Sequence, residues 1–198
     1  MPTTINGTTG VSLVANNATI NTPAISGGTL TSSTLVTPTI SGTVTGLSAA
    51  SLPTGSVIQV VYTTTNTQAT YTRGQIMTPL TTSITPSSAS SRIIVMLTIG
   101  LGQDAGADIG INVVRNGVDL QLGSGGSNTN STFVPIMGYS SGNFNQQTLT
   151  LLDSPATTSA VTYTFYNYVN GVRTAYFNRR GADTTYACSS SVVLMEVK

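Results

Sequence analysis

The sequence has no histidine, one cysteine and one lysine, and each shortage removes a class of chemistry. Without histidine, a Ser-His-Asp triad, a Cys-His pair and a histidine-based metal site are all excluded. The one lysine, Lys198, is the last residue, which argues against a buried Schiff-base lysine. Cys188 has no partner for an intrachain disulfide, and its place in the predicted final strand indicates a small buried thiol. We therefore expect no enzymatic activity, no cofactor and no metal ion.

Charged residues are also scarce, because they make up only 7% of the 198 residues and leave a net charge of +1. In globular domains about a quarter of the residues are charged. The chain has no basic stripe, which argues against nucleic-acid binding. It has neither a basic and apolar N-terminal signal nor an apolar run of about 20 residues, so we expect neither export nor a membrane span. Threonine, serine, glycine and asparagine fill the gap, which favours an all-β, extended and assembled protein.

The few charges are unevenly placed, since no Asp, Glu, Lys or Arg occurs before Arg73. Within this neutral stretch, the segment Thr19–Gly27 recurs as Thr34–Gly42, with Pro23 matched by Pro38 at a period of 15 residues. Each copy has a short β-branched run, a proline, one more apolar residue and a Ser-Gly turn. A unit this short has too few large apolar side chains for a core of its own. The repeat therefore predicts an extended element that packs against identical neighbours or along a larger surface.

We interpret residues 1–52 as an attachment arm or stem. An exposed neutral segment with β-branched runs would promote edge-to-edge pairing, so we expect a partner to cover it. Three copies wound together would bury equivalent apolar side chains against one another, which predicts a homotrimer. The side chains expected to pack in this way are Ile20, Ile25, Leu35 and Ile40.

Residues 53–198 have the pattern of an antiparallel β-sandwich, jelly-roll-like, with no segment of helical period. The most apolar run, Ser91–Ile99, indicates a central strand buried on both faces. Asn116-Gly117 is typical of a hairpin turn, and within Ala160–Val169 the odd and even positions are expected on opposite faces. The other predicted strands are Ser56–Thr65, Arg73–Thr82 with an interruption at Pro79, Asp108–Arg115, Val118–Leu122, Thr132–Tyr139, Asn145–Leu152, Val172–Asn178 and Ala187–Val197.

Aromatic and polar side chains in the second half of the chain form a candidate contact surface. Tyrosine rings beside amide groups suit saccharide or protein surfaces, although tyrosines in strands more often belong to a core or its rim. The adjacent Arg179 and Arg180 would grip a carboxylate, a phosphate or an acidic sugar, or form a salt bridge between subunits. The residues predicted to contact a host-surface glycan or protein are Tyr139, Asn143, Phe144, Tyr166, Tyr168, Arg173, Arg179 and Arg180.

Asp104 and Asp108 form a candidate carboxylate pair on a glycine-rich connection. If they faced each other, the pair would suit glycosidase-type catalysis or a Ca²⁺ site. Calcium needs about six to eight oxygen ligands, and Gln103 with backbone carbonyls would supply only some of them. Aspartate in such connections commonly stabilises turns, so we expect a solvated turn here.

Five short motifs follow one another over about Pro53 to Lys198. They are Ser83-Ile84-Thr85-Pro86-Ser87-Ser88, Ser91-Arg92-Ile93-Ile94-Val95, Val114-Arg115-Asn116-Gly117, Leu152-Asp153-Ser154-Pro155-Ala156-Thr157-Thr158 and Leu194-Met195-Glu196-Val197. Together they resemble a domain found in virion structural and fibre proteins of tailed bacteriophages. Because the motifs consist of turns and strand starts, they indicate a domain type and bring no catalytic residues. The repetitive arm is similar in style to phage fibre stems.

This resemblance implies a structural protein of the virion, made in the host cytoplasm. We expect an oligomeric tail or head fibre whose arm binds other virion proteins of the capsid or tail, and whose sandwich forms a knob that contacts the host. Two alternatives stay open, a capsid decoration or cement protein and a carbohydrate-binding surface module. A depolymerase is least favoured, because such enzymes usually have a longer β-helix and more acidic residues.

Overall fold

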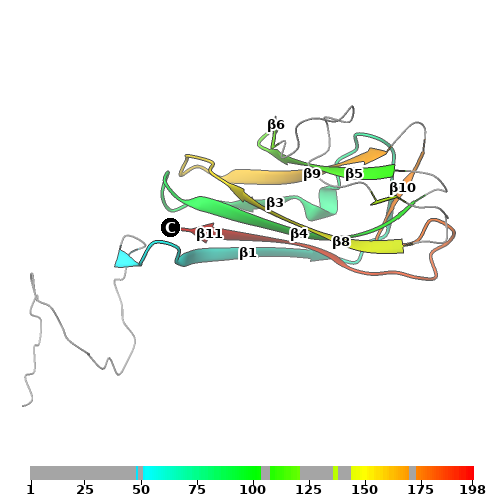
Figure 1. Cartoon of the computed structure of the whole chain (residues 1–198), viewed down its shortest axis with the longest axis horizontal. Helices are drawn as coiled ribbons and strands as arrows, with labels where there is room; N and C mark the ends of the chain where they lie inside the picture. Colours follow the sequence, from blue (N-terminus) through cyan, green and yellow to red (C-terminus); the bar gives the residue numbers. More distant parts are fainter. Residues whose placement is uncertain (1–47, 49–50, 104–107, 121–135, 138–143, 170–172) are drawn as a thin grey trace, which may run out of the picture. The chain divides into compact units, whose positions relative to one another are not determined.

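The computed structural model describes residues 48, 51–103, 108–120, 136–137, 144–169 and 173–198. These residues form two antiparallel β-sheets that stack as layers, with β9 and β5 in one layer and β1, β11, β4 and β8 in the other (Figure 1). The all-β antiparallel sandwich predicted from the sequence is therefore confirmed. The predicted arm contacts at Ile20, Ile25, Leu35 and Ile40 lie outside the described residues.

The six-stranded sheet is built around β4 (Arg92–Gln103). One edge of β4 pairs with β8 (Phe144–Asp153), and the other pairs first with β11 (Ser190–Val197) and then with β10 (Ala175–Phe177). The sheet continues outward from these two strands. The outer strands are β1 (Val57–Thr65), which pairs with β11, and β2 (Ala69–Tyr71), which pairs with β10.

The five-stranded sheet is built around the pair β5 (Asp108–Arg115) and β9 (Val161–Val169). The Asn116-Gly117 turn connects β5 to β6 (Val118–Asp119), with φ of 47° and 82° at the two turn residues, as the hairpin prediction requires. The remaining strands are β3 (Thr82–Ile84), which pairs with β9, and β7 (Ile136–Met137), which pairs with β5.

The core lies between the sheets and follows the period-two alternation of the strands. In β9 every odd position is buried and every even position is half-buried, as the sequence predicted. Each fully buried large apolar side chain contributes about 1.5–3 kcal/mol relative to exposure. The core side chains include Ile93, Val95, Leu97, Ile99 and Leu101 of β4, Val192 and Leu194 of β11, Ile109, Ile111 and Val113 of β5, and Val161, Tyr163, Phe165 and Val169 of β9.

Three local predictions were wrong. Residues 73–81 form no strand, although the interruption predicted at Pro79 is present as a 3-10 turn at Thr78–Leu80 (η2). The central strand β4 is not buried on both faces over the predicted run, because its outward residues Ile94, Met96 and Thr98 are only half-buried. Cys188 precedes β11 and is half-buried, and burial raises the pKa of its thiol.

A buried carboxylate ties the end of β11 to the loop that follows β3. Glu196 is fully buried and accepts hydrogen bonds from the backbone N–H of Ser87 (2.7 Å), the Ser87 hydroxyl (2.6 Å) and the Gln59 amide (2.6 Å). Burial alone would raise the pKa of Glu196, but hydrogen bonds from Ser87, Ser91 and Gln59 outweigh it, so that the pKa is lowered. The ionised form is therefore the stabilising one.

A second buried carboxylate joins the two sheets. Asp153 of β8 accepts from the Arg115 guanidinium (2.7 Å) and from the Tyr163 hydroxyl (2.7 Å), both of which belong to the opposite sheet. Arg115 and Tyr163 are themselves cross-strand partners in the β5–β9 ladder. Burial, and then the hydrogen bond to Asp153, raises the pKa of Tyr163 above its usual range.

Glu196→Gln tests the hydrogen bonds that the buried Glu196 carboxylate accepts. Because the pKa of Glu196 is lower in the folded state than its unfolded value near 4.3, its contribution is complete above about pH 4.3 and is lost as pH falls through the folded pKa. We expect the variant to lose about 1–3 kcal/mol of unfolding free energy at pH 7 and to show a weaker acid dependence. Denaturant titrations at several pH values measure both effects. The exposed Asp119→Asn is the control, and an equal acid dependence in wild type and Glu196→Gln would contradict the assignment.

Candidate functional site

The outer face of the five-stranded sheet carries a tyrosine-lined hollow, and its floor follows from strand register. In the β5–β9 ladder, Asn112 pairs with Tyr166 and Gly110 pairs with Tyr168. These even-numbered residues of β9 point away from the core, where the odd-numbered ones are buried. Glycine has no side chain, so nothing from position 110 covers the ring of Tyr168. The register therefore places two aromatic rings and one amide on the same open face.

One wall of the hollow comes from the segment before η2, which runs along the free edge of β9. The backbone N–H of Gly74 donates to the carbonyl oxygen of Asn167 (2.8 Å), and the N–H of Asn167 donates to that of Gln75 (3.2 Å). The buried Asn167 side chain also accepts from the N–H of Gln75 (3.0 Å). These bonds bring Arg73 beside β9, where its guanidinium carbon lies 4.4 Å from the ring centroid of Tyr168.

The opposite wall comes from the β5–β6 hairpin. The Asn116 side chain accepts a hydrogen bond from the backbone N–H of Thr162 (2.8 Å), which holds the turn against β9. The hairpin pairs Asp119 with Val114 and brings it within reach of Asn112. The Asn112 amide then donates to an Asp119 carboxylate oxygen at 3.3 Å. Asn112 is thus oriented by the hairpin.

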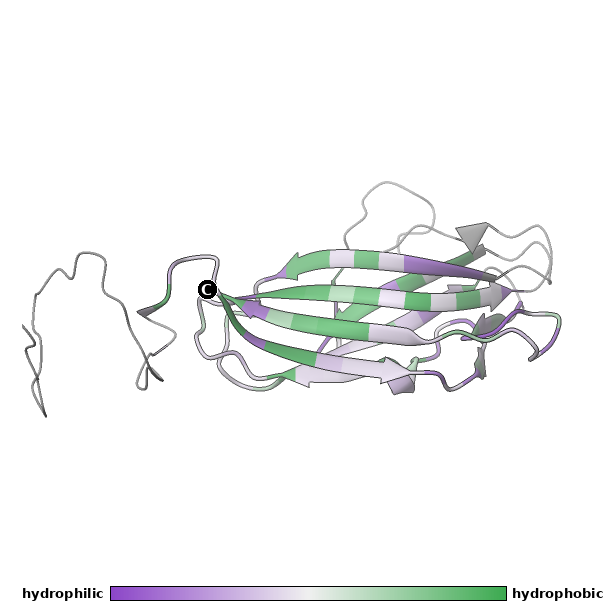
Figure 2. Ribbon diagram, turned by 90° about the horizontal axis from the view of Figure 1, so that it is seen from below, coloured by the Kyte–Doolittle hydropathy of each residue, from purple (hydrophilic) through white to green (hydrophobic). Residues whose placement is uncertain are grey.

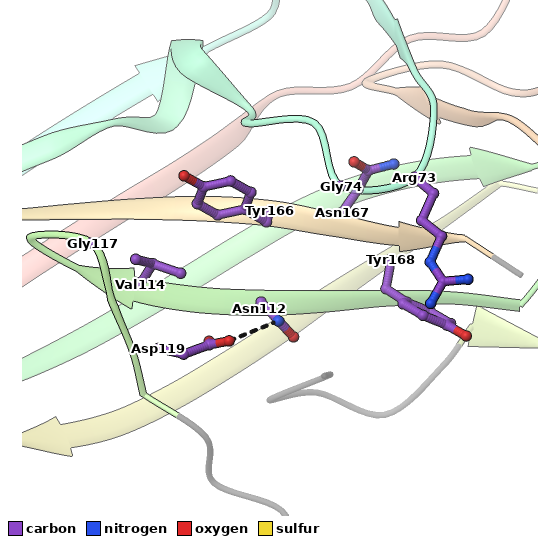
Figure 3. A pocket seen from close by; sticks show the side chains of 9 residues that line it. All are labelled: Arg73, Gly74, Asn112, Val114, Gly117, Asp119, Tyr166, Asn167 and Tyr168. Carbon is purple, nitrogen blue, oxygen red and sulfur yellow. Dashed lines mark hydrogen bonds between the residues drawn. The ribbon is translucent and has the colours of Figure 1, made fainter. Parts of the chain in front are cut away.

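The resulting hollow has a volume of about 400 Å³. Figure 3 shows Arg73 and Tyr168 at one end and the Asn112–Asp119 pair toward the other. Among the described residues, the buried side-chain oxygen of Asn112 has no hydrogen-bond donor. Aromatic faces, a cation and an oriented amide with spare acceptor capacity are the groups that bind hydroxyl-rich ligands. The lining residues are Arg73, Gly74, Asn112, Val114, Gly117, Asp119, Tyr166, Asn167 and Tyr168.

Two of the eight predicted contact residues, Tyr166 and Tyr168, meet in this hollow. Tyr139 and Asn143 lie outside the described residues, and of Phe144 only the backbone is described, at the start of β8. Arg173 is exposed just before β10, in the other sheet. The predicted surface is therefore divided between two faces of the sandwich.

Arg179 and Arg180 follow β10 and are bound within their own chain. Arg180 donates to Asp183 (Nε to Oδ1, 2.7 Å) and lies over the ring of Tyr186, with its guanidinium carbon 4.4 Å from the centroid. The hydrogen bonds from Arg180, with one from the Thr185 backbone, lower the pKa of Asp183 below its usual range. Arg179 lies over Tyr176 at 4.3 Å and donates to the Thr70 hydroxyl (3.1 Å). Arg180 thus forms its ion pair with Asp183 inside the subunit, and the inter-subunit salt bridge considered from the sequence stays a prediction for Arg179.

The site includes three residues that the sequence prediction missed: Arg73, Asn112 and Asp119. Asn112 had a usable signal, because it lies at an outward position of the correctly predicted strand 108–115. Asp119 follows from the Asn-Gly hairpin once that turn is accepted. Arg73 had no signal, because its position depends on the segment wrongly predicted as a strand.

In the part of the chain that the structure describes, no group of three or more His, Cys, Asp or Glu side chains could hold a metal ion. The predicted carboxylate pair stays untested, because residue 104 and the side chain of Asp108 lie outside that part. No helix among the described residues is long and apolar enough to cross a membrane. Among the described residues that line the hollow, Asp119 is the one carboxylate.

Gly102 allows the arginine segment to pack on β4. A Cβ at this position would lie 2.4 Å from the carbonyl oxygen of Arg179 and 2.7 Å from the Cα of Arg180. Both are backbone atoms, so the segment would have to move. We expect Gly102→Ala to lower the unfolding free energy by about 1–3 kcal/mol, measured by denaturant titration. Equal stability of wild type and Gly102→Ala would contradict the packing.

Comparisons with known proteins give little beyond the fold. No protein-family profile matches the chain, and no curated protein matches it. One similar solved structure is the crystal structure of the infectious bursal disease virus VP2 subviral particle, at 11% identity and a TM-score of 0.32. That match covers 70% of this chain and 37% of the VP2 chain, so the chain spans well under half of the protein it matches. A likeness this low carries no argument about function.

Proposed function

We propose that this chain is a non-enzymatic structural protein of a tailed-bacteriophage virion, an oligomeric tail or head fibre. The observation that carries the proposal is the distribution of charge along the chain. The first 72 residues, which comprise the arm and the strands β1 and β2, have no charged side chain, and every charge lies from Arg73 onward. A neutral, β-branched segment of this length is soluble and specific only when it is covered. An attachment arm buried in an assembly meets that requirement, with the sandwich as a jelly-roll-like knob.

The five motifs of the resemblance support this proposal in a physical way. They supply both buried carboxylates, Asp153 and Glu196, together with their partners Ser87 and Arg115. Buried charges are costly unless they are paired, so such residues mark how a domain is held together more than what it binds. The motifs are thus suited to identify a domain type. A homotrimer is the assembly we propose, with the arm bound to other virion proteins.

Copy number in purified particles distinguishes a fibre from a decoration or cement protein. A fibre is present in few copies, whereas a cement protein follows the symmetry of the capsid and is present in many. Quantitative mass spectrometry of purified particles, scaled to the major capsid protein, measures this. We expect a low copy number, and absence of the chain from particles would contradict a virion role altogether.

Deleting residues 1–50 tests the role of the arm. Because the described core strands all begin at or after Val57, we expect the truncated chain to keep a folded β-sandwich by circular dichroism and a cooperative melt. We also expect it to be missing from particles assembled without the wild-type copy. Incorporation at the wild-type level would show that the arm is not the anchor.

The hollow favours a saccharide as the ligand of the knob. Its tyrosines, its cation and the spare acceptor of Asn112 suit stacking and hydrogen bonding to sugar hydroxyls. We expect Tyr168→Ala to weaken binding of host-surface oligosaccharides at least about tenfold, which corresponds to ~1.4 kcal/mol. Calorimetric titration of a panel of such oligosaccharides measures this, with Tyr186→Ala, an exposed tyrosine in the segment between β10 and β11, as the control. Equal loss in both variants would contradict a site in the hollow.

A further inference from the structure

The outer face of the six-stranded sheet is apolar over four neighbouring strands. The register of β1, β11, β4 and β8 aligns their outward residues in rows across the sheet. Figure 2 looks onto this sheet and shows hydrophobic residues gathered in the half of the strands near the C terminus. We call these two rows the apolar face: Val60, Met195, Ile94 and Leu152 in the first, and Tyr62, Val193, Met96 and Thr150 in the second.

The apolar face is open to solvent in the single subunit. Val60 is 56% exposed, Tyr62 60% and Leu152 51%, while the residues between them are half-buried or exposed. Neighbouring strands lie about 4.8 Å apart, so the side chains within each row are adjacent, and a large contiguous apolar patch on a protein surface marks an interaction site. The core on the other side of the sheet already has its own packing, so these side chains do not contribute to it.

Charge separates this face from the rest of the molecule. Neither row contains a charged residue, and Arg92 lies only at the end of β4, beyond them. The opposite face, in contrast, carries Arg73 and Asp119 in the hollow. The edge strand β1 also has no charge and no proline to protect it, and in the described residues it pairs only with β11.

We infer that the apolar face is the interface between copies of this chain. A surface that packs against a symmetry-related copy of itself must not carry like charges that repel each other, and a charge-free face meets this condition. A partner of opposite charge would instead require a charged face on this chain. The neutral stretch of the sequence also includes the whole of β1, so the edge strand of the apolar face carries no charge. The inference rests on the proposed oligomeric assembly and names the surface of the knob that holds it.

Methionine oxidation in the wild-type full chain tests whether the face is covered. Hydrogen peroxide transfers one oxygen atom to a thioether and leaves as water, at a rate that follows exposure of the sulfur. Met96 and Met195 lie on the apolar face and are half-buried in the subunit, whereas Met77 is fully buried in the core. If copies cover the face, Met96 and Met195 should oxidise as slowly as Met77, as followed by peptide mass spectrometry.

Charge placed on the face tests whether the cover is another copy. Val60→Lys and Tyr62→Lys alter side chains that are already more than half exposed, so the subunit should still fold. They would bring like charges together at a self-interface, and we expect each to weaken association at least about tenfold in sedimentation velocity and to speed oxidation of Met96. Val118→Lys is the matched control, because Val118 is 57% exposed but belongs to the other sheet; its association should be unchanged.

Each outcome decides the inference. Slow oxidation of an associated wild type, lost in the two β1 variants and kept in Val118→Lys, supports it. An associated chain with fast oxidation overturns it while the proposed function stands, because the arm alone would then hold the copies together. Slow oxidation in a monomer overturns it in favour of cover by the chain's own residues 1–47. Fast oxidation in a monomer overturns both. If the lysine variants fail to melt cooperatively, the wild-type oxidation rates decide.

Discussion

The buried Asp153 carboxylate is the interaction on which both outer faces depend. It extends from β8 of one sheet to Arg115 and Tyr163 of the other, which face each other in the β5–β9 ladder. A slip of one residue in either ladder would turn every side chain to the opposite face and leave a charge buried without its partner. The tie therefore selects one register for β5 against β9. That register is what places Asn112 beside Tyr166 and leaves Tyr168 uncovered.

The two outer faces differ in chemistry because the hollow includes charged side chains and the apolar face does not. The five-stranded sheet presents a cation, a carboxylate, an amide and two phenols around a hollow. The two rows of the apolar face consist of valine, isoleucine, leucine, methionine and tyrosine side chains with one threonine, and no charge. A polar, hollow face suits a hydroxyl-rich ligand, and a neutral, apolar face suits a second copy. One small domain thus has room both to assemble and to bind.

The sequence predicts well those features that depend on local periodicity. Local composition and alternation predicted strands at Ser56–Thr65, Asp108–Arg115 and Ala160–Val169, each within one residue of the observed strand, and Asn116-Gly117 identified the hairpin. It predicts poorly what depends on pairing between distant segments. Residues 73–82 have strand-forming composition, yet Pro79 turns them, and the hydrogen bonds that hold Arg73 are made by β9. The half-exposed outer face of β4 could not be predicted from the sequence. An apolar run has the same composition whether other parts of the chain, a second copy or solvent cover that face.

Sedimentation equilibrium of the purified full chain tests the central claim most directly, since both the proposed fibre and its interface require assembly of identical copies. One chain has a mass of 20.3 kDa. The account predicts a single species with the mass of three chains that persists on dilution. A species with the mass of one chain at every concentration would contradict it.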